Sequence, residues 1–254
     1  LISALVLFYA APERLRRYVL LAASYFFYAS WNPAFLPLLW SLTAIDYAAA
    51  IWIERRRTRW ALVMSLAANL GFLGFFKYYN FFADSLRDSF LSLGISLDLP
   101  TLKLILPVGI SFYTFHGLSY IIDIYFKRIK AEHDFVDYSL FVSYFPLLVA
   151  GPIERATHLL PQLKVKREFN FEKAKEGIYQ IIWGLVKKVV IADTCANYAN
   201  EIFNHYNSMN SLSLILGAVY FAFQIYGDFS GYSDIALGTS KLFGIDLLKN
   251  FNYP

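Results

Sequence analysis

Long, nearly uninterrupted apolar stretches are the feature that most constrains how this chain of 254 residues folds. Two such runs occupy residues 34–53 and 60–76, and another begins at Leu212. Runs of about 20 apolar residues are typical of membrane-spanning helices. The chain is 57% hydrophobic and 17% charged, whereas a soluble domain carries roughly a quarter charged residues. The pattern predicts an all-α, polytopic integral membrane bundle.

Basic residues mark alternate ends of the predicted spans. Arginines gather at residues 12–17 and 54–59, and further basic residues follow a predicted span over 104–126. The turn at residues 31–33 has none. The positive-inside rule then puts residues 12–17 and 54–59 in the cytoplasm.

Other segments are predicted to lie outside simple spans. Residues 81–103 are mixed in polarity, which is typical of an amphipathic segment along the outer interface. Residues 137–153 are apolar but short, and Pro146 and Pro152 interrupt them. A run of this kind favours a re-entrant or buried helix.

The segments that follow alternate between predicted loops and helices. Residues 156–169 and 193–210 are polar and are predicted to be loops. Residues 171–191 are predicted to be a helix with Asn170 as its N-cap. Lys187 and the lysine after it lie too deep for a lipid-facing span, so we expect this helix to lie tilted or against other helices. The chain shows no internal repeat or linker, and we interpret residues 1–254 as one domain.

The most informative stretch is residues 220–254. It begins apolar and then carries polar residues interleaved with Gly227 and Gly231, which lie one helical turn apart. Small residues at this spacing allow close helix packing, and polar residues in a membrane usually face a cavity or a partner. Asp228 and Asp234 lie roughly 120° apart on a helix, so they are not a facing acid–base pair. Capping of helix ends is the alternative role for both aspartates.

Three blocks of sequence carry a resemblance to a known family. They are LPVGISFYTFHGLSYIIDIYFKR (106–128), FVSYFPLLVAGPIERATHLLPQL (141–163) and GDFSGYSDIALGTSKLFGIDLLKNFNYP (227–254). In this order they resemble the membrane-bound O-acyltransferase family, in the branch typified by bacterial alginate O-acetyltransferases. Because three blocks match in order over most of the chain, the signal is specific.

The resemblance implies an enzyme that transfers an acetyl group to a hydroxyl of an exported polysaccharide such as alginate. It implies a multi-pass protein of the bacterial inner membrane, with a donor such as acetyl-CoA on the cytoplasmic side and no bound cofactor. The acceptor is an extracytoplasmic polysaccharide or an acetyl-relay protein. A histidine in a helical funnel is the family's general base.

The resemblance also governs which site residues we assign. The family's histidine motifs follow residues 250–254, so we interpret the sequence as an N-terminal fragment truncated at both ends, inactive by itself, and assign no catalytic residue. Candidates for the wall of the substrate tunnel are Tyr226, Asp228, Ser230, Tyr232, Asp234, Asn250 and Asn252.

Two further candidates lie earlier in the chain. His116 shares a helix face with Tyr120 and Asp123, which suits a proton relay or an interhelical hydrogen-bonding face. We favour the second for His116, because the related branch often has glutamine there. Arg155 could bind a phosphate or carboxylate of the acyl donor, or pair with Glu154 or with lipid headgroups.

Mid-span Asp46 must find a partner or be protonated, and the sequence does not say which partner. The single cysteine, Cys195, excludes an intrachain disulfide. No histidine grouping has metal-ligand spacing, and His133, His158 and His205 are predicted to be plain surface residues. No basic patch favours nucleic-acid binding.

Two functions of other classes stay open at this point. One is a transporter or channel whose substrate path is lined by residues 109–123 and 224–234. The other is a non-catalytic scaffold of a polysaccharide-export complex.

Overall fold

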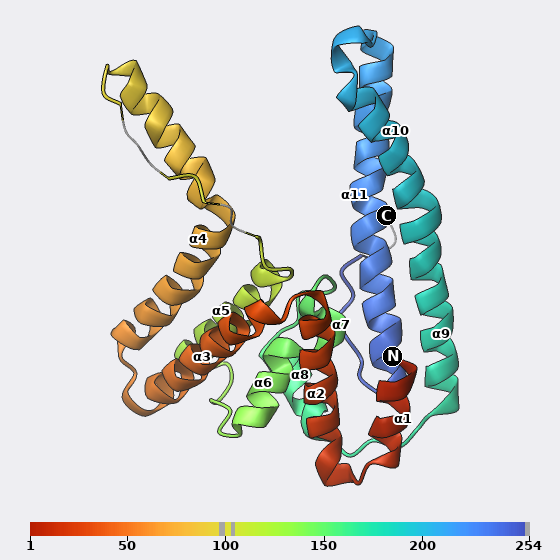
Figure 1. Cartoon of the computed structure of the whole chain (residues 1–254). Coiled ribbons are helices and arrows are strands. Elements are labelled where there is room, and N and C mark those ends of the chain that lie inside the picture. The colour runs from red at the N-terminus through yellow and green to blue at the C-terminus, as the bar shows by residue number, and fades with distance from the viewer. Residues whose placement is uncertain (97–99, 103–104, 252–254) are drawn as a thin grey trace.

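The computed structural model describes residues 1–96, 100–102 and 105–251, and every regular element in that part of the chain is a helix (Figure 1). The elements are α1 (Ile2–Ala10), α2 (Glu13–Trp31), the 3-10 turn η1 (Pro33–Phe35), α3 (Leu36–Arg56), α4 (Arg59–Ser92), α5 (Ile110–Tyr125), α6 (Phe135–Ser143), α7 (Phe145–Leu148), α8 (Ala156–Lys164), α9 (Phe171–Leu185), the π-helix η2 (Val186–Ala192), α10 (Asp193–Asn204), the 3-10 turn η3 (Tyr206–Ser208) and α11 (Ser211–Leu242). The prediction of an all-α protein is confirmed.

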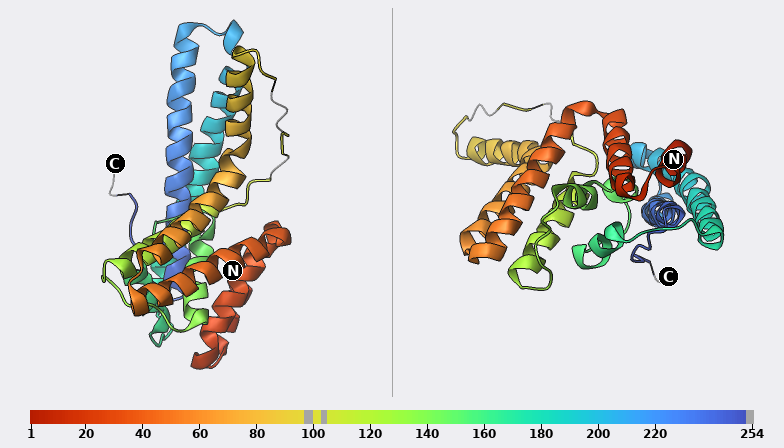
Figure 2. Two further views of the ribbon diagram at one scale, coloured as in Figure 1. Left: turned by 90° about the vertical axis from the view of Figure 1, so that its left-hand side faces the viewer. Right: turned by 90° about the horizontal axis from the view of Figure 1, so that it is seen from below.

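The helices form two groups joined by a central layer (Figures 1 and 2). In one group α3, α4 and α5 pack against each other. In the other, α9, η2 and α10 pack along α11. Helices α2, α6, α7 and α8 lie between the groups, and α7 contacts α2, α5 and α11. The predicted buried helix over 137–153 is part of this layer, where Phe141 and Leu148 are fully buried.

Three helices in the described part of the chain are long and apolar enough to cross a membrane: η1 with α3 (Pro33–Arg56), α4 and α11. Only about a tenth of the apolar window of α11 is buried inside the structure. Large apolar side chains such as Phe223 and Ile225 therefore point outward from it. An apolar surface of this size is typical of contact with lipid or with another protein chain. The protein is an all-α membrane protein.

Helix α4 corrects two predicted boundaries. It was expected to end near residue 76, with residues 81–103 lying along the interface, but it continues to Ser92. The reason is that no glycine or proline interrupts residues 77–92, and the break comes at Gly94, with φ +78°. At about 1.5 Å per residue its 34 residues extend about 50 Å, beyond a hydrocarbon layer of about 30 Å. Residues 97–99 and 103–104 of the predicted segment lie outside the described residues.

Helix α5 is shorter than the span predicted over 104–126. It begins at Ile110 because Gly109 before it has φ +73°, which only glycine adopts easily. Gly109 also touches the backbone of α7, since a Cβ there would lie 1.9 Å from the carbonyl oxygen of Leu148.

Two predicted loops are helices. Residues 156–169 contain α8, and residues 193–210 contain α10. In α8 the buried residues are Ala156, Leu159, Leu160 and Leu163, a spacing that gives one apolar helix face. Polar residues between them led to the loop prediction, which was wrong. Asn170 caps α9 as predicted, accepting a hydrogen bond from the backbone N–H of Lys173 at 3.0 Å.

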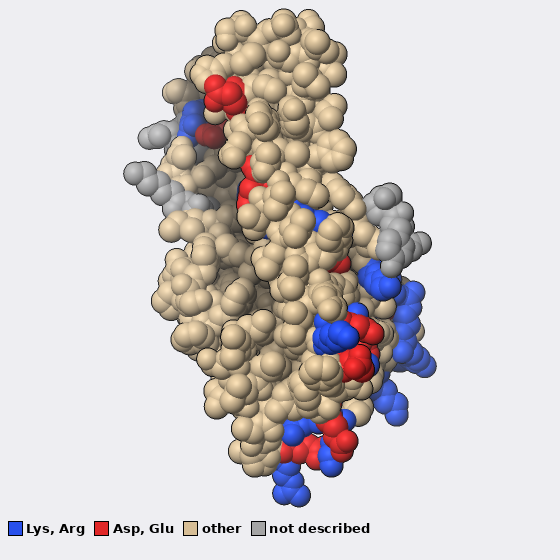
Figure 3. Space-filling view, turned by 90° about the vertical axis from the view of Figure 1, so that its right-hand side faces the viewer, with Lys and Arg blue, Asp and Glu red and all other residues tan. Residues whose placement is uncertain are grey.

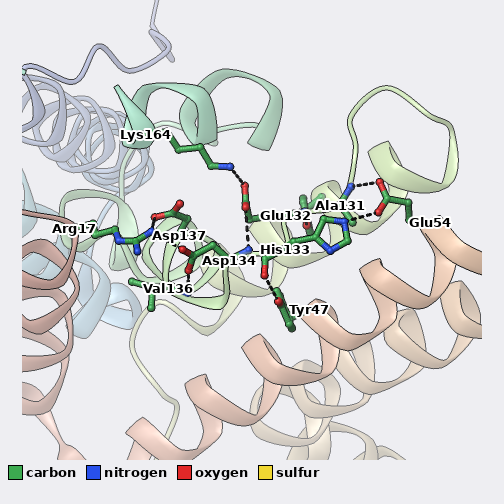
Figure 4. Close-up of polar contacts among 11 residues, drawn as sticks. Arg17, Tyr47, Glu54, Ala131, Glu132, His133, Asp134, Val136, Asp137 and Lys164 are labelled. Atoms are coloured by element: carbon green, nitrogen blue, oxygen red, sulfur yellow. Dashed lines mark hydrogen bonds and ion pairs between the residues drawn. The ribbon is translucent and has the colours of Figure 1, made fainter. Parts of the chain in front are cut away.

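The basic turns meet on one side of the molecule, as a single orientation in a membrane requires. The α1–α2, α3–α4, α5–α6 and α8–α9 connections all lie on the lower side of Figure 1. Contacts around Glu132, His133 and Asp134 tie them together (Figure 4). His133 Nε2 lies 2.9 Å from Glu54 Oε2, and Lys164 pairs with Glu132. His133 is therefore a partner of Glu54 and not the isolated surface residue that the sequence predicted.

Candidate functional site

The polar half of α11 packs closely against α9 and η2. A Cβ on Gly231 would lie 2.8 Å from the carbonyl oxygen of Gly184, and a Cβ on Gly227 would lie 3.0 Å from the Cβ of Ala192 and 3.2 Å from the carbonyl oxygen of Lys187. The close helix packing predicted from the spacing of Gly227 and Gly231 is therefore confirmed. Because the backbones approach so closely, side chains beside the glycines reach directly from one helix to the other.

The aspartates of α11 pair with lysines of η2. Lys187 Nζ lies 2.7 Å from Asp234 Oδ2 and donates to Ser230 Oγ at 2.8 Å. Gln180 Nε2 donates to the other carboxylate oxygen of Asp234 at 3.1 Å. Both oxygens of this carboxylate are thus occupied. Asp234 is held by one cation and one amide in a site where its side chain is 17% exposed.

Asp228 belongs to a separate pair. Lys188 Nζ lies 2.7 Å from Asp228 Oδ1 and 2.6 Å from Asp193 Oδ1. Both Asp228 and Asp234 lie in the middle of α11, so the alternative that they cap helix ends is wrong. As predicted, they do not face each other as an acid–base pair, since each contacts a different lysine.

The π-helix η2 brings adjacent lysines onto α11. In an α-helix consecutive side chains point about 100° apart, but Lys187 and Lys188 both reach carboxylates of the same neighbouring helix. The wider π turns at Val186–Ala192 shift the helical register at this point. The sequence indicated that these lysines lie against other helices, and the structure confirms it.

A pocket of about 380 Å³ opens beside the Lys187–Asp234 pair. Its volume lies in the range of small-molecule sites. It is lined by Gln180, Trp183, Lys187, Tyr226, Ser230, Ser233, Asp234, Leu237, Lys249, Asn250 and Phe251. Asn250 Nδ2 donates to the carbonyl oxygen of Gly151 at 3.1 Å, which fixes the segment after α11 against the α7–α8 connection. Phe251 packs edge-on against Tyr226.

The structure brings together only part of the predicted tunnel wall. Four candidates line the pocket: Tyr226, Ser230, Asp234 and Asn250. Asp228 and Tyr232 lie beside Lys188 instead, with Lys188 Nζ 5.8 Å from the centre of the Tyr232 ring. Asn252 lies outside the described residues. No sequence pattern singled out Gln180, Trp183, Lys249 or Phe251, whereas the depth of Lys187 was a usable signal.

His116 is buried in α5, away from this pocket. Its ring lies 5.7 Å from that of Phe141 and contacts the backbone of Val142, and both of these residues belong to α6. Its predicted companions bond elsewhere: Tyr120 Oη accepts from the backbone N–H of Glu132 at 2.7 Å, and Asp123 pairs with Arg128 at 3.0 Å. The structure therefore does not join these three residues in a proton relay, and His116 instead faces α6.

Arg155 is exposed and directly precedes α8. Among the described residues it does not form the ion pair with Glu154 that was one of its predicted alternatives. Glu154 is fully buried, accepts a hydrogen bond from the backbone N–H of Leu248, and lies 2.9 Å from His158 Nδ1. The prediction of His158 as a plain surface residue was wrong. Glu154 joins α8 to the segment that carries Asn250.

The pocket is suited to a polar ligand that carries hydroxyl groups. Its buried carboxylate is already paired with Lys187, while the hydroxyls of Ser230 and Ser233 and the amide of Asn250 supply neutral hydrogen-bonding groups. Trp183 and Tyr226 add aromatic surface. Within the described residues no group of three His, Cys, Asp or Glu side chains could hold a metal ion.

Comparison with known proteins points to the same region. Residues 125–254, about half of the chain, match the model of the MBOAT, membrane-bound O-acyltransferase family. This match covers α6 to α11 and the pocket between them.

Curated relatives match over a longer range. The probable alginate O-acetylase AlgI of Pseudomonas aeruginosa is 41% identical over 98% of this chain and 48% of its own length. The peptidoglycan O-acetyltransferase of Helicobacter pylori is 36% identical over 92% of this chain and 49% of its own. The teichoic acid D-alanyltransferase of Bacillus subtilis is 28% identical over 61% of this chain. The chain spans about half the length of the first two relatives, and it belongs to the membrane-bound O-acyltransferase family.

Proposed function

We propose that the protein containing this chain transfers an acetyl group to a hydroxyl of an exported polysaccharide. The names of the relatives support this, because one is a probable alginate O-acetylase and another is a peptidoglycan O-acetyltransferase. We further propose a multi-pass protein of the bacterial inner membrane. The three candidate spans and the common side of the basic turns support that placement.

The donor we propose is an acetyl ester or thioester such as acetyl-CoA, reaching the protein from the cytoplasmic side. The acceptor is an extracytoplasmic polysaccharide such as alginate, or a protein that relays the acetyl group to it. We treat residues 1–254 as one domain, in keeping with the packing of α7 against both α5 and α11.

The pocket beside Lys187 and Asp234 is the part of the chain that we assign to binding. The amide of Asn250 and the hydroxyls of Ser230 and Ser233 can hydrogen-bond acceptor hydroxyls. None of the described residues that line the pocket is a histidine. We therefore assign them to binding and orientation of the acceptor, which lowers the entropic cost of transfer, and not to proton transfer.

One observation carries the proposal: Asp234, paired with Lys187, lies in the pocket, while Asp228, paired with Lys188, lies outside it on the same helix. Asp228→Asn is therefore a matched control for Asp234→Asn. In cells that produce the complete protein, we expect Asp234→Asn to lower O-acetylation of the exported glycan at least several-fold. Asp228→Asn should leave it within twofold of wild type.

The amount of exported glycan is measured in the same cells, together with the level of each variant in the membrane. Equal acetylation in the two variants at equal protein levels would refute the assignment of the pocket. Reduced export with unchanged acetylation per chain would indicate a transporter.

A further inference from the structure

A second pocket, of about 750 Å³, lies between the α1–α2 turn and the α8–α9 connection. Its floor is apolar, formed by Phe8, Leu20 and Leu163. Its rim is strongly basic, with six cationic side chains against the two acidic ones, Glu13 and Asp137. The cationic residues are Arg14, Arg16, Arg17, Lys164, Lys166 and Arg167. Figure 3 shows basic side chains gathered on the lower half of the face it displays, whereas the upper half is mostly uncharged.

Three of the six cations pair with carboxylates, and the loosest pair is that of Lys166, 3.9 Å from Glu13. Arg17 pairs with Asp134 and, at 3.2 Å, with Asp137 (Figure 4). Lys164 pairs with Glu132. These pairs hold the wall of the pocket in place, but they leave little positive charge available for a ligand.

Arg16 and Arg167 differ from these paired cations, because their side chains donate to backbone carbonyls and not to carboxylates. Arg16 Nε donates to the carbonyl oxygen of Ala11 at 3.2 Å, and Arg16 Nη1 donates to that of Arg167. Arg167 Nε donates to the carbonyl oxygen of Gly244 at 3.3 Å. Neither guanidinium forms an ion pair with a described carboxylate. A guanidinium has five N–H donors, so both keep donors for a ligand.

The guanidiniums are also fixed in place before any ligand binds. Arg16 lies over the rings of Phe8 and Tyr9, at 5.4 and 5.6 Å from their centres. Burial lowers the pKa of Arg167, which reflects the cost of keeping this cation out of water without a counter-charge. An anion bound between the two arginines would offset that cost.

We propose that this pocket binds a phosphate-bearing ligand, with the phosphate group held between Arg16 and Arg167. Paired guanidiniums match the planar, bidentate hydrogen bonding of phosphate oxygens. Exposed Arg14 and Lys166, which is 3.9 Å from Glu13, add charge at the rim. The apolar floor suits a ligand whose phosphate adjoins apolar groups. The phosphate can come from a lipid headgroup or from a soluble phosphate ester, and the inference does not depend on acyl transfer.

The test uses the complete protein that contains this chain, with thermal unfolding as the readout. A ligand that binds the folded state and not the unfolded state stabilises the protein by RT ln(1 + [L]/Kd), so the unfolding temperature rises with ligand concentration. Inorganic pyrophosphate, added to protein in a neutral detergent, probes a soluble source. Bilayer discs of phosphatidylcholine with or without phosphatidylglycerol probe a lipid source. Each probe is titrated to give an apparent affinity.

Two variants separate binding from folding. The double substitution Arg16→Gln and Arg167→Gln removes the proposed ligands, and Arg14→Gln with Lys166→Gln removes rim charges that hold no backbone in place. Arg55→Gln with Arg56→Gln is the control, because it removes two charges from the last turn of α3 outside this pocket.

We expect the first variant to weaken binding about tenfold or more, as loss of charge-assisted hydrogen bonds does. The rim variant should weaken it by a smaller but measurable factor, and the control should match wild type. A pyrophosphate response with this pattern identifies a soluble ester, and a phosphatidylglycerol response with this pattern identifies a lipid. If neither probe distinguishes the rim variant from the control, the proposal is overturned, even where the first variant fails to fold.

Discussion

Asp46 Oδ1 in α3 lies 2.6 Å from the side-chain amide nitrogen of Asn69 in α4, and both residues are almost fully buried. Ser65, one turn earlier on α4, donates to the same oxygen at 2.6 Å. Gly117 of α5 packs onto the group so closely that a Cβ there would lie 2.1 Å from Asp46 Oδ2. The partner that the sequence required for Asp46 is therefore a pair of neutral donors, and the contact joins three helices.

Replacing Asp46 tests this interpretation. Asp46→Ala leaves the donors of Ser65 and Asn69 without an acceptor, so we expect a loss of about 1–3 kcal/mol in the free energy of unfolding. Asp46→Asn keeps an acceptor oxygen and should retain most of the stability. Chemical unfolding in detergent micelles gives both values. If the Asn variant is as unstable as the Ala variant, the ionised carboxylate itself is required and the neutral-donor account fails.

The glycines of the α9–α11 contact give a second prediction. A Cβ on Gly238 would lie 2.4 Å from the carbonyl oxygen of Gly177, so Gly238→Ala must push the two helices apart. Overpacking of this kind costs about 1–3 kcal/mol. Gly71→Ala on α4 is the matched control, since nothing lies within 4 Å of its Cβ. We expect the control to gain about 0.5–1 kcal/mol from lower backbone entropy in the unfolded chain. Thermal unfolding of the two variants in the same detergent should give shifts of opposite sign.

Local patterns in the sequence were enough for the helices and for one contact between them. The apolar runs predicted α3 and α11, and the spacing of Gly227 and Gly231 predicted the surface along which α11 packs. Both depend on residues close together in the chain. Helix periodicity and small-residue spacing report such local features directly.

Pairing between helices could not be predicted in the same way. Lys187 and Asp234 are 47 residues apart, and helix periodicity does not tell which lysine meets which aspartate. Glu154 and His158 are a different case, because they are only four residues apart at the start of α8, which begins at Ala156. That signal was available, but the polar composition of residues 156–169 favoured a loop and concealed it.

The Lys187–Asp234 pair gives the third prediction. Its side chains are 16% and 17% exposed, so Lys187→Met leaves a mostly buried carboxylate without its cation. We expect a loss of at least about 2 kcal/mol, somewhat less than the ~3–5 kcal/mol of a fully buried pair. Adding Asp234→Asn should recover part of it, giving a coupling energy of about 1 kcal/mol or more. Chemical unfolding of the two single variants and the double variant measures this coupling.

The surface pair Lys173–Asp246 is the comparison for this double-mutant cycle. Its side chains are 45% and 56% exposed, and such pairs contribute about 0.2–1 kcal/mol. A coupling energy for Lys187–Asp234 no larger than that of the surface pair would contradict the buried interaction.

The pKa values of two aspartates at the start of α6, Asp134 and Asp137, are shifted in opposite directions. Burial raises the pKa of Asp134, but hydrogen bonds from the backbone N–H of Val136 and from Arg17 outweigh it, so the net shift lies below the ordinary value of 3.8. For Asp137 burial dominates, and its pKa is raised despite Arg17. Asp134 therefore adds stability that is present above pH 3.8 and is lost as the pH falls through its folded pKa. Asp137 adds stability below pH 3.8 that is lost as the pH rises through its folded pKa.

Asparagine at either position removes one of these titrations. Asp134 is the N-cap of α6, and asparagine keeps this cap because it also caps helices well. At pH 7 we expect Asp134→Asn to be less stable than wild type and Asp137→Asn to be more stable, since the first loses a favourable charge and the second loses a costly buried one. Chemical unfolding at a series of pH values from 7 to about 3 measures both effects. The deficit of the Asp134 variant should shrink as the pH falls below about 4, where wild type protonates the same group. A deficit that stays constant over this range would show that Asp134 acts through packing and not through its charge.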